Sequence, residues 1–95
     1  MSLPAFLHPF SETGRTAHTK LVAGHGSTVV DEHGNEYLDA IASLWCVNVG
    51  HGRTEVIEAV HRQMQALATY NTFGRWTNEP AEELAGLIAE RAPMA

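Results

Sequence analysis

The 95-residue sequence has little lysine, little cysteine and no cluster of basic residues. Lysine occurs once, at Lys20, and the five arginines are scattered. The net charge is −5, and no basic patch is available for binding nucleic acid. Because Cys46 is the only cysteine, an internal disulfide is excluded, and we expect a reducing, cytoplasmic compartment. No apolar run approaches the roughly 18 residues of a membrane helix. The opening MSLPAFLHPF lacks the charged and long apolar regions of a signal peptide.

The composition that remains, 44% hydrophobic and 18% charged, is typical of a globular chain. Ninety-five residues allow one small domain at most, and a domain of this size is only modestly stable alone. Aromatic residues make up only 7%, which predicts a thin core. We expect the chain to be the N-terminal part of a longer protein, because its last predicted helix has an apolar stripe with no following sequence to pack against it.

The pattern after residue 20 predicts a small antiparallel sheet. Residues 1–20 look like an arm, interrupted by prolines and without a clear period. We expect a strand near Ser27–Asp31, a turn through Gly34, where glycine accepts a positive φ, and a return strand over Glu36–Asp39. Together these form a hairpin. The short apolar run Leu44–Val49 is of β type and is predicted to be a third strand.

A change to helical spacing predicts a first helix near residues 55–68. Thr54 is the expected N-cap, and Glu55 is favourable in the first turn. The apolar positions that recur at helical intervals are Val56, Ile57, Val60, Met64 and Leu67.

A second helix is predicted after the irregular aromatic stretch 70–77. Thr77 or Asn78 is a suitable cap, Pro80 is tolerated in the first turn, and Pro93 ends the helix. Its apolar stripe consists of Leu84, Leu87 and Ile88. The expected fold class is therefore α+β, with a hairpin plus a third strand and two helices.

The string SLWCVNVGHG, residues 43–52, is the strongest sign of a binding pocket. Trp45 and Cys46 can supply an apolar wall, and the glycines let the backbone approach a ligand. A core tryptophan beside a buried free cysteine is the alternative, since both residue types are common in interiors. The residues alone leave both interpretations open.

Other polar residues predict structural roles. Gly50-His51-Gly52 has neither the length nor the lysine of a phosphate-binding loop, so a strand-to-helix turn is the better interpretation. The six histidines include no pair four residues apart, and we predict no metal site. Asp31, Glu36 and Asp39 are expected at turns and strand ends rather than in acid–base catalysis.

Six short strings, taken in order, resemble the class III aminotransferases that depend on pyridoxal 5'-phosphate (PLP), and the ω-transaminase branch in particular. Each string alone is weak, but their order and spacing are specific. They are His8–Phe10, Asp31–Asp39, Ser43–Gly52, Arg62–Met64, Tyr70–Phe73 and Asn78–Pro93.

This resemblance implies part of the small domain of a fold-type-I PLP enzyme. The arm would be 1–20, the small-domain part 21–69, and 70–95 would be the loop and first helix leading into an absent large domain. By position in the match, Phe10, Leu44, Trp45, Cys46 and Phe73 correspond to substrate-pocket residues. The full-length enzyme would be a homodimer that transfers an amino group from an ω-amino acid or amine to a keto acid.

The resemblance assigns no catalytic, cofactor-binding or metal residue to these 95 positions. The family holds its cofactor on a lysine, and Lys20 does not match that position, so the segment alone is expected to be inactive. A tryptophan at position 76 departs from the smaller or charged residue expected there. Two alternatives remain open: a non-catalytic oligomerisation module derived from the family, and an aminomutase or decarboxylase relative.

Overall fold

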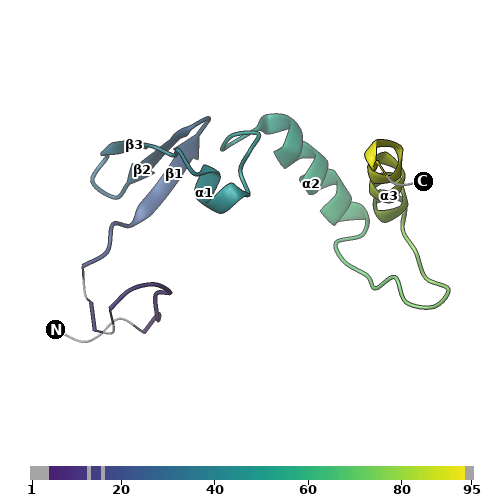
Figure 1. Cartoon of the computed structure of the whole chain (residues 1–95), viewed down its shortest axis with the longest axis horizontal. Coiled ribbons are helices and arrows are strands. Elements are labelled where there is room, and N and C mark those ends of the chain that lie inside the picture. Colours follow the sequence, from purple (N-terminus) through teal and green to yellow (C-terminus); the bar gives the residue numbers. More distant parts are fainter. Residues whose placement is uncertain (1–4, 13, 16, 94–95) are drawn as a thin grey trace. The chain divides into compact units, whose positions relative to one another are not determined.

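A three-stranded antiparallel sheet and three helices make up the computed structural model, which describes residues 5–12, 14–15 and 17–93 (Figure 1). The chain consists of two units, Met1–Ile57 and Glu58–Ala95. In chain order the elements are β1 (Leu21–His25), β2 (Thr28–Asp31), β3 (Glu36–Leu38), α1 (Ala42–Trp45), α2 (Thr54–Ala66) and α3 (Glu79–Arg91).

The predicted hairpin is confirmed, and it forms β2 and β3. The two strands pair antiparallel, with Val29 opposite Tyr37, and Gly34 takes a φ of +83° in the turn between them. The third strand is β1, which pairs with the other edge of β2 and is joined to it by a tight turn at Gly26, where φ is +57°. Glycine is suited to both turns because it adopts positive φ without steric cost.

The prediction of a strand over Leu44–Val49 is wrong. The chain instead makes the short helical turn α1, within which Ala42, Ser43 and Trp45 have positive φ. The cause lies just upstream, where the Asp39 carboxylate accepts a hydrogen bond from the Ser43 N–H at 2.8 Å and turns the chain straight after β3. Local backbone bonds then replace a strand ladder, as short polar side chains often bring about.

Both predicted long helices are present. α2 begins at Thr54, and the Arg53 carbonyl accepts from the Val56 and Ile57 N–H groups, so the cap position falls on Arg53 rather than on Thr54. α3 begins after Asn78, whose side chain accepts from the Ala81 N–H at 3.0 Å. It ends at Arg91, as predicted from the proline that follows.

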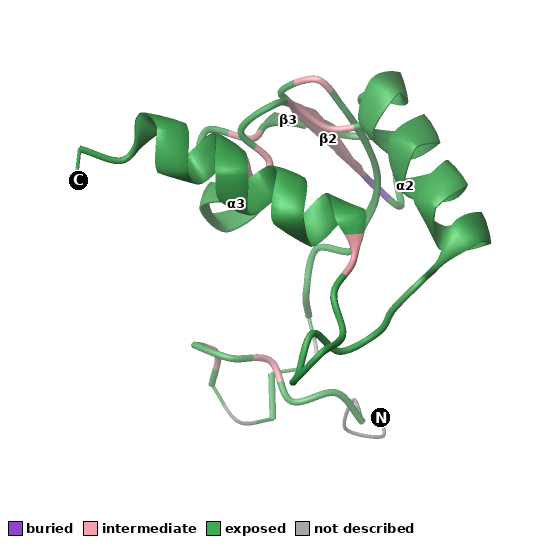
Figure 2. Cartoon of the chain, turned by 90° about the vertical axis from the view of Figure 1, so that its right-hand side faces the viewer, coloured by how far each residue is buried: buried purple, intermediate pink, exposed green. Residues whose placement is uncertain are grey.

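The apolar stripes of the two helices are exposed. Along α2 the stripe residues range from 50% exposed at Val56 to 61% at Met64, and within the described residues no hydrophobic side chain is buried. Figure 2 shows this pattern, with α2 and α3 exposed, β2 less exposed, and further pink stretches in the N-terminal arm and just before α3. Most of the stability of a helix in a protein comes from packing its apolar face. The apolar faces of α2 and α3 are left largely unpacked within the described residues.

Across residues 5–12, 14–15 and 17–93, the helices are too short or too polar to cross a membrane.

Substituting Asn78 with alanine tests the start of α3. The change removes the acceptor for the Ala81 N–H and should cost about 1 kcal/mol of local helix stability. Faster amide hydrogen exchange over the first turn of α3 is the expected readout in the full-length protein. Asn78→Asp keeps an acceptor and serves as the control; equal exchange in both variants would contradict the capping role.

Candidate functional site

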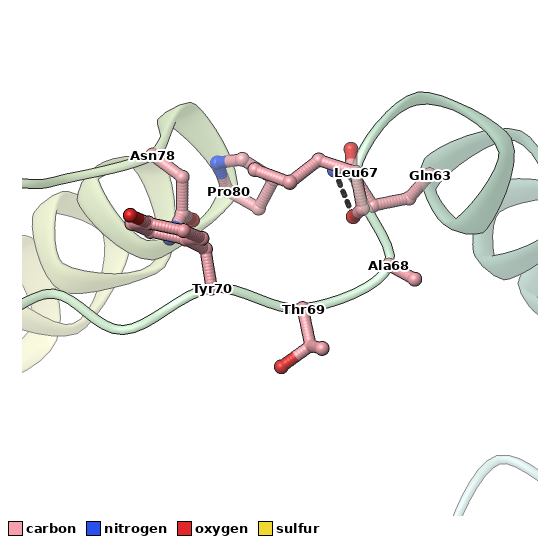
Figure 3. A pocket seen from close by; sticks show the side chains of 7 residues that line it. All are labelled: Gln63, Leu67, Ala68, Thr69, Tyr70, Asn78 and Pro80. Carbon is pink, nitrogen blue, oxygen red and sulfur yellow. Dashed lines mark hydrogen bonds between the residues drawn. The ribbon is translucent and has the colours of Figure 1, made fainter.

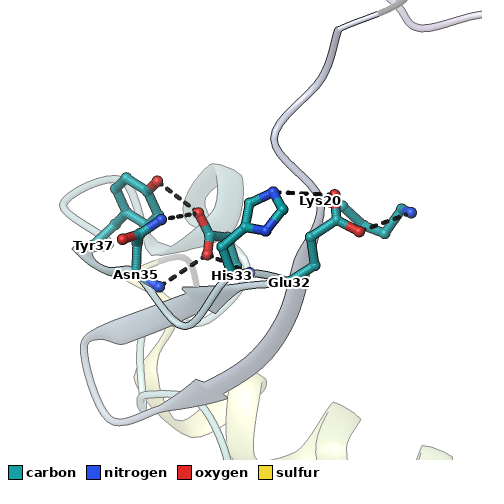
Figure 4. A network of polar contacts seen from close by, with 6 residues as sticks. Lys20, Glu32, His33, Asn35 and Tyr37 are labelled. Atoms are coloured by element: carbon teal, nitrogen blue, oxygen red, sulfur yellow. Dashed lines mark hydrogen bonds and ion pairs between the residues drawn. The ribbon is translucent and has the colours of Figure 1, made fainter.

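Asp31 organises the β2–β3 turn and is 4% exposed. Its Oδ1 accepts from the His33 and Asn35 N–H groups, both at 2.9 Å. Its Oδ2 accepts from the Asn35 side-chain amide at 3.0 Å and the Tyr37 hydroxyl at 2.8 Å. Figure 4 shows the side chains of Asn35 and Tyr37 directed at the same carboxylate.

These contacts shift two pKa values. The hydrogen bonds, that from the Asn35 side chain first, hold the pKa of Asp31 well below its ordinary value. The bond to Asp31 raises the pKa of Tyr37. Each oxygen of the Asp31 carboxylate accepts two hydrogen bonds, and all four come from residues 33–37 of the same hairpin. This agrees with the turn role predicted for Asp31.

The pocket candidates Leu44, Trp45 and Cys46 lie consecutively on α1 and just after it. Leu44 is 70% exposed, Trp45 is 82% exposed, and Cys46 is also exposed. Trp45 has a φ of +66°, a backbone conformation that is uncommon for a bulky residue. Residues in such conformations cluster at functional sites, where the surrounding structure holds them in place.

The other two pocket candidates, Phe10 and Phe73, lie elsewhere in the sequence. Phe10 is fully exposed in the stretch before β1 and has a φ of +54°. Phe73 belongs to the second unit, is 79% exposed, and donates its N–H to the Asn71 side chain at 3.0 Å. Phe10, Leu44, Trp45 and Cys46 thus belong to the first unit, where the last three are consecutive, and Phe73 belongs to the second.

A hollow of about 290 Å³ lies between the end of α2 and the start of α3 (Figure 3). The Gln63 side chain lines it and donates to the Leu67 carbonyl at 3.1 Å. None of the five pocket candidates lines it, and the lining contains no charged side chain. The lining residues are Gln63, Leu67, Ala68, Thr69, Tyr70, Asn78 and Pro80.

Sequence reasoning missed a contact between Asp39 and His51. The His51 Nε2 lies 2.7 Å from the Asp39 Oδ2, and these side chains are only 22% and 9% exposed. The hydrogen bond with His51, followed by that from the Ser43 N–H, lowers the pKa of Asp39. The residues are 12 positions apart, so the only available signals were an aspartate ending a strand and a histidine between two glycines.

The backbone of His51 is also fixed. It forms a two-way bridge with Gly26, whose N–H donates to the His51 carbonyl at 2.9 Å while the His51 N–H donates back at 2.8 Å. Gly50 and Gly52 on either side have φ of +92° and +70°. The string Gly50-His51-Gly52 thus leads into α2 as predicted, but the element before it is α1 rather than the strand that a strand-to-helix turn requires.

Lys20 forms an exposed ion pair beside the sheet. Its Nζ lies 3.1 Å from the Glu32 Oε2, and its side chain is 71% exposed. Within the part of the chain that the structure describes, no group of three or more histidine, cysteine, aspartate or glutamate residues could hold a metal ion.

Comparison with known proteins gives one consistent family. The family model described as aminotransferase class-III matches residues 10–94. The putrescine–pyruvate aminotransferase of Pseudomonas aeruginosa is 46% identical over 83 residues, which are 87% of this chain and 18% of that protein.

Two solved structures have the same fold over nearly the whole chain. A thermostable (S)-enantioselective omega-transaminase from Thermomicrobium roseum is 42% identical with a TM-score of 0.86, covering 93% of this chain and 20% of that one. The omega transaminase from Pseudomonas jessenii in complex with PMP is 29% identical with a TM-score of 0.88, covering 94% and 20%. The chain thus spans about a fifth of the length of the relatives it matches.

Proposed function

This chain belongs to the class III aminotransferases, and we propose that the protein containing it transfers an amino group from an ω-amino acid or amine to a keto acid. The observation that carries the proposal is the family match over residues 10–94. The named relatives support the substrate class, since one acts on putrescine and pyruvate by its name and others are omega-transaminases.

PLP as cofactor and a homodimeric, cytoplasmic enzyme belong to the same proposal. A neighbour solved with PMP supports the cofactor. Residues 21–69 would form part of the small domain, and residues 70–95 would lead into the large one. Because Lys20 does not match the family's position for the cofactor's anchoring lysine, we assign that lysine to the part of the protein outside these 95 residues.

Phe10, Leu44, Trp45, Cys46 and Phe73 are the proposed substrate-pocket residues. Their position in the match to the family supports this assignment, since exposure is common to the hydrophobic side chains of the described residues. The left-handed φ values of Phe10 and Trp45 add support, since such strain persists where function requires it.

The decisive test is amino transfer by the protein encoded by the complete reading frame that contains this chain. Supplied with PLP, putrescine and pyruvate, it should form alanine as pyruvate disappears. Omitting the amine is the control, and the 95-residue segment alone should form no alanine. No alanine with putrescine, diaminobutyrate or β-alanine would contradict the proposal. Release of carbon dioxide, or migration of the amino group within one substrate, would indicate a decarboxylase or an aminomutase instead.

A non-catalytic oligomerisation module is the second candidate, and the exposed stripe of α2 favours it. Sedimentation of the segment at several concentrations separates the two. Self-association together with an inactive full-length protein supports the module, and a monomeric segment contradicts it.

A further inference from the structure

The Oδ2 atom of Asp39 is a single acceptor shared by two donors from different parts of the first unit. The Ser43 N–H reaches it at 2.8 Å from the start of α1, and the His51 Nε2 lies 2.7 Å away from beyond the Gly50 turn. Since Asp39 directly follows β3, this one oxygen ties both ends of the segment 43–51 to the sheet. Trp45 and Cys46 lie inside that segment.

The position of the His51 ring is itself set by the sheet. The ring lies against the backbone of β1 at Gly24, where a Cβ would come within 2.9 Å of the His51 Cγ. The bridge between His51 and Gly26 fixes the main chain beside it. The ring therefore has little freedom, and its Nε2 presents a fixed donor to Asp39.

The tethered segment needs such support because its backbone is strained. Ser43 and Trp45 have φ of +63° and +66°, and Ala42 just before the segment has +49°, a region that costs L-residues roughly 1–2 kcal/mol each. Strained backbone persists only when the surrounding structure holds it. The bond between Ser43 and Asp39 is the side-chain contact at the centre of this strained stretch.

We propose that Asp39 and His51 are positioning residues that hold the Ser43–Cys46 segment in its strained conformation and so fix where Trp45 and Cys46 stand in the substrate pocket. Neither residue needs to touch the substrate. This inference rests on the proposed aminotransferase function. In that enzyme, the Asp39–His51 pair would help to determine which amines are accepted as amino donors.

The test compares two substitutions at His51 in the full-length enzyme. His51→Phe keeps a flat ring over Gly24 but has no donor for Asp39. His51→Gln keeps a donor, because its side-chain amide nitrogen lies about as far along the chain as Nε2. The surface variant His61→Phe, on an exposed position of α2, is the matched control.

Two readouts are taken from each variant. The first is the ratio of kcat/KM for a bulky amine to that for a small one. We expect His51→Phe to shift this ratio by about tenfold or more, as small misplacements of a pocket wall do, while His51→Gln and His61→Phe stay close to wild type. The second is hydrogen–deuterium exchange of the peptide covering residues 41–47, which should speed up only in His51→Phe.

Each outcome supports or overturns the proposal that Asp39 and His51 position the Ser43–Cys46 segment. An unchanged ratio and exchange in His51→Phe would overturn the proposal, and so would a His51→Gln variant as defective as His51→Phe. If His51→Phe fails to fold, Asp39→Asn is measured instead. It weakens the acceptor without removing it, and it should shift both readouts in the same direction by a smaller amount; no shift would overturn the proposal. If wild type transfers no amino group, the proposed function fails separately, and the exchange readout alone decides whether the pair holds the segment.

Discussion

Replacing Asp31 with alanine is expected to disrupt the β2–β3 hairpin more than any other single change in the sheet. The substitution removes the acceptor for four donors at once: two backbone N–H groups, an amide and a phenol hydroxyl. Loss of amide protection over Thr28–Leu38 on the order of a hundredfold is the expected size, because donors left without a partner are costly.

Hydrogen–deuterium exchange on the full-length protein measures this effect. Glu36→Ala removes another carboxylate from the same hairpin, one that is exposed, and should change protection little. Asp31→Asn is the intermediate case. Its remaining oxygen can serve the two backbone donors, while Asn35 and Tyr37 can reorient toward the new amide. Equal protection in Asp31→Ala and wild type would show that the turn does not depend on the carboxylate.

Acid should weaken the same hairpin, and the sign follows from the lowered pKa of Asp31. Below the ordinary value of 3.8, the unfolded chain takes up a proton that the folded carboxylate refuses. The stabilisation is therefore fully present above that pH and declines as the pH falls below it. Asp39, whose pKa is also lowered, contributes in the same direction. In Asp31→Asn the acid dependence of protection over Thr28–Leu38 should be smaller than in wild type.

Replacing Trp45 with alanine is expected to change which amines the full-length enzyme accepts, with little effect on stability. The indole is 82% exposed within this chain, so its removal opens space without breaking a core. If it lines the substrate pocket, bulky donors should gain over small ones by roughly ten- to a hundredfold in kcat/KM, the range that pocket volume commonly controls.

The measurement pairs kcat/KM for one bulky and one small amine with the thermal midpoint of the protein. Phe6→Ala, an exposed aromatic outside the proposed pocket, is the control. A lowered midpoint with an unchanged preference would make Trp45 a packing residue and remove it from the proposed site.

Local signals in the sequence were sufficient for the hairpin and the long helices. Gly34 marks the turn, Asn78 with Pro80 starts α3, and Pro93 marks its end, since the glycine and prolines act through their own backbone geometry and Asn78 caps a neighbouring N–H. The run Leu44–Val49 failed for the opposite reason. The β-type residues of this run do not indicate that the Asp39 carboxylate accepts a hydrogen bond from the Ser43 N–H. That hydrogen bond turns the chain where a strand was predicted.

In the candidate site, too, the features that depend on neighbouring residues could be predicted and those that depend on distant residues could not. The string around Trp45 and Cys46 was recognisable because unusual residues stand side by side in the sequence. The contact between Asp39 and His51 was not, because it depends on β1 and β2 bringing Gly26 next to His51, and pairing between distant backbone segments leaves no periodic trace.

The exposed stripes of α2 and α3 determine how the segment must be handled in solution. Such surfaces make copies of a protein adhere, and only mutual repulsion keeps them dispersed. At neutral pH the charge of −5 supplies that repulsion, but it vanishes near the isoelectric point of about 5.6. Mildly acidic buffers therefore favour precipitation, and slightly alkaline buffers of low ionic strength are the conditions in which the segment stays colloidally stable.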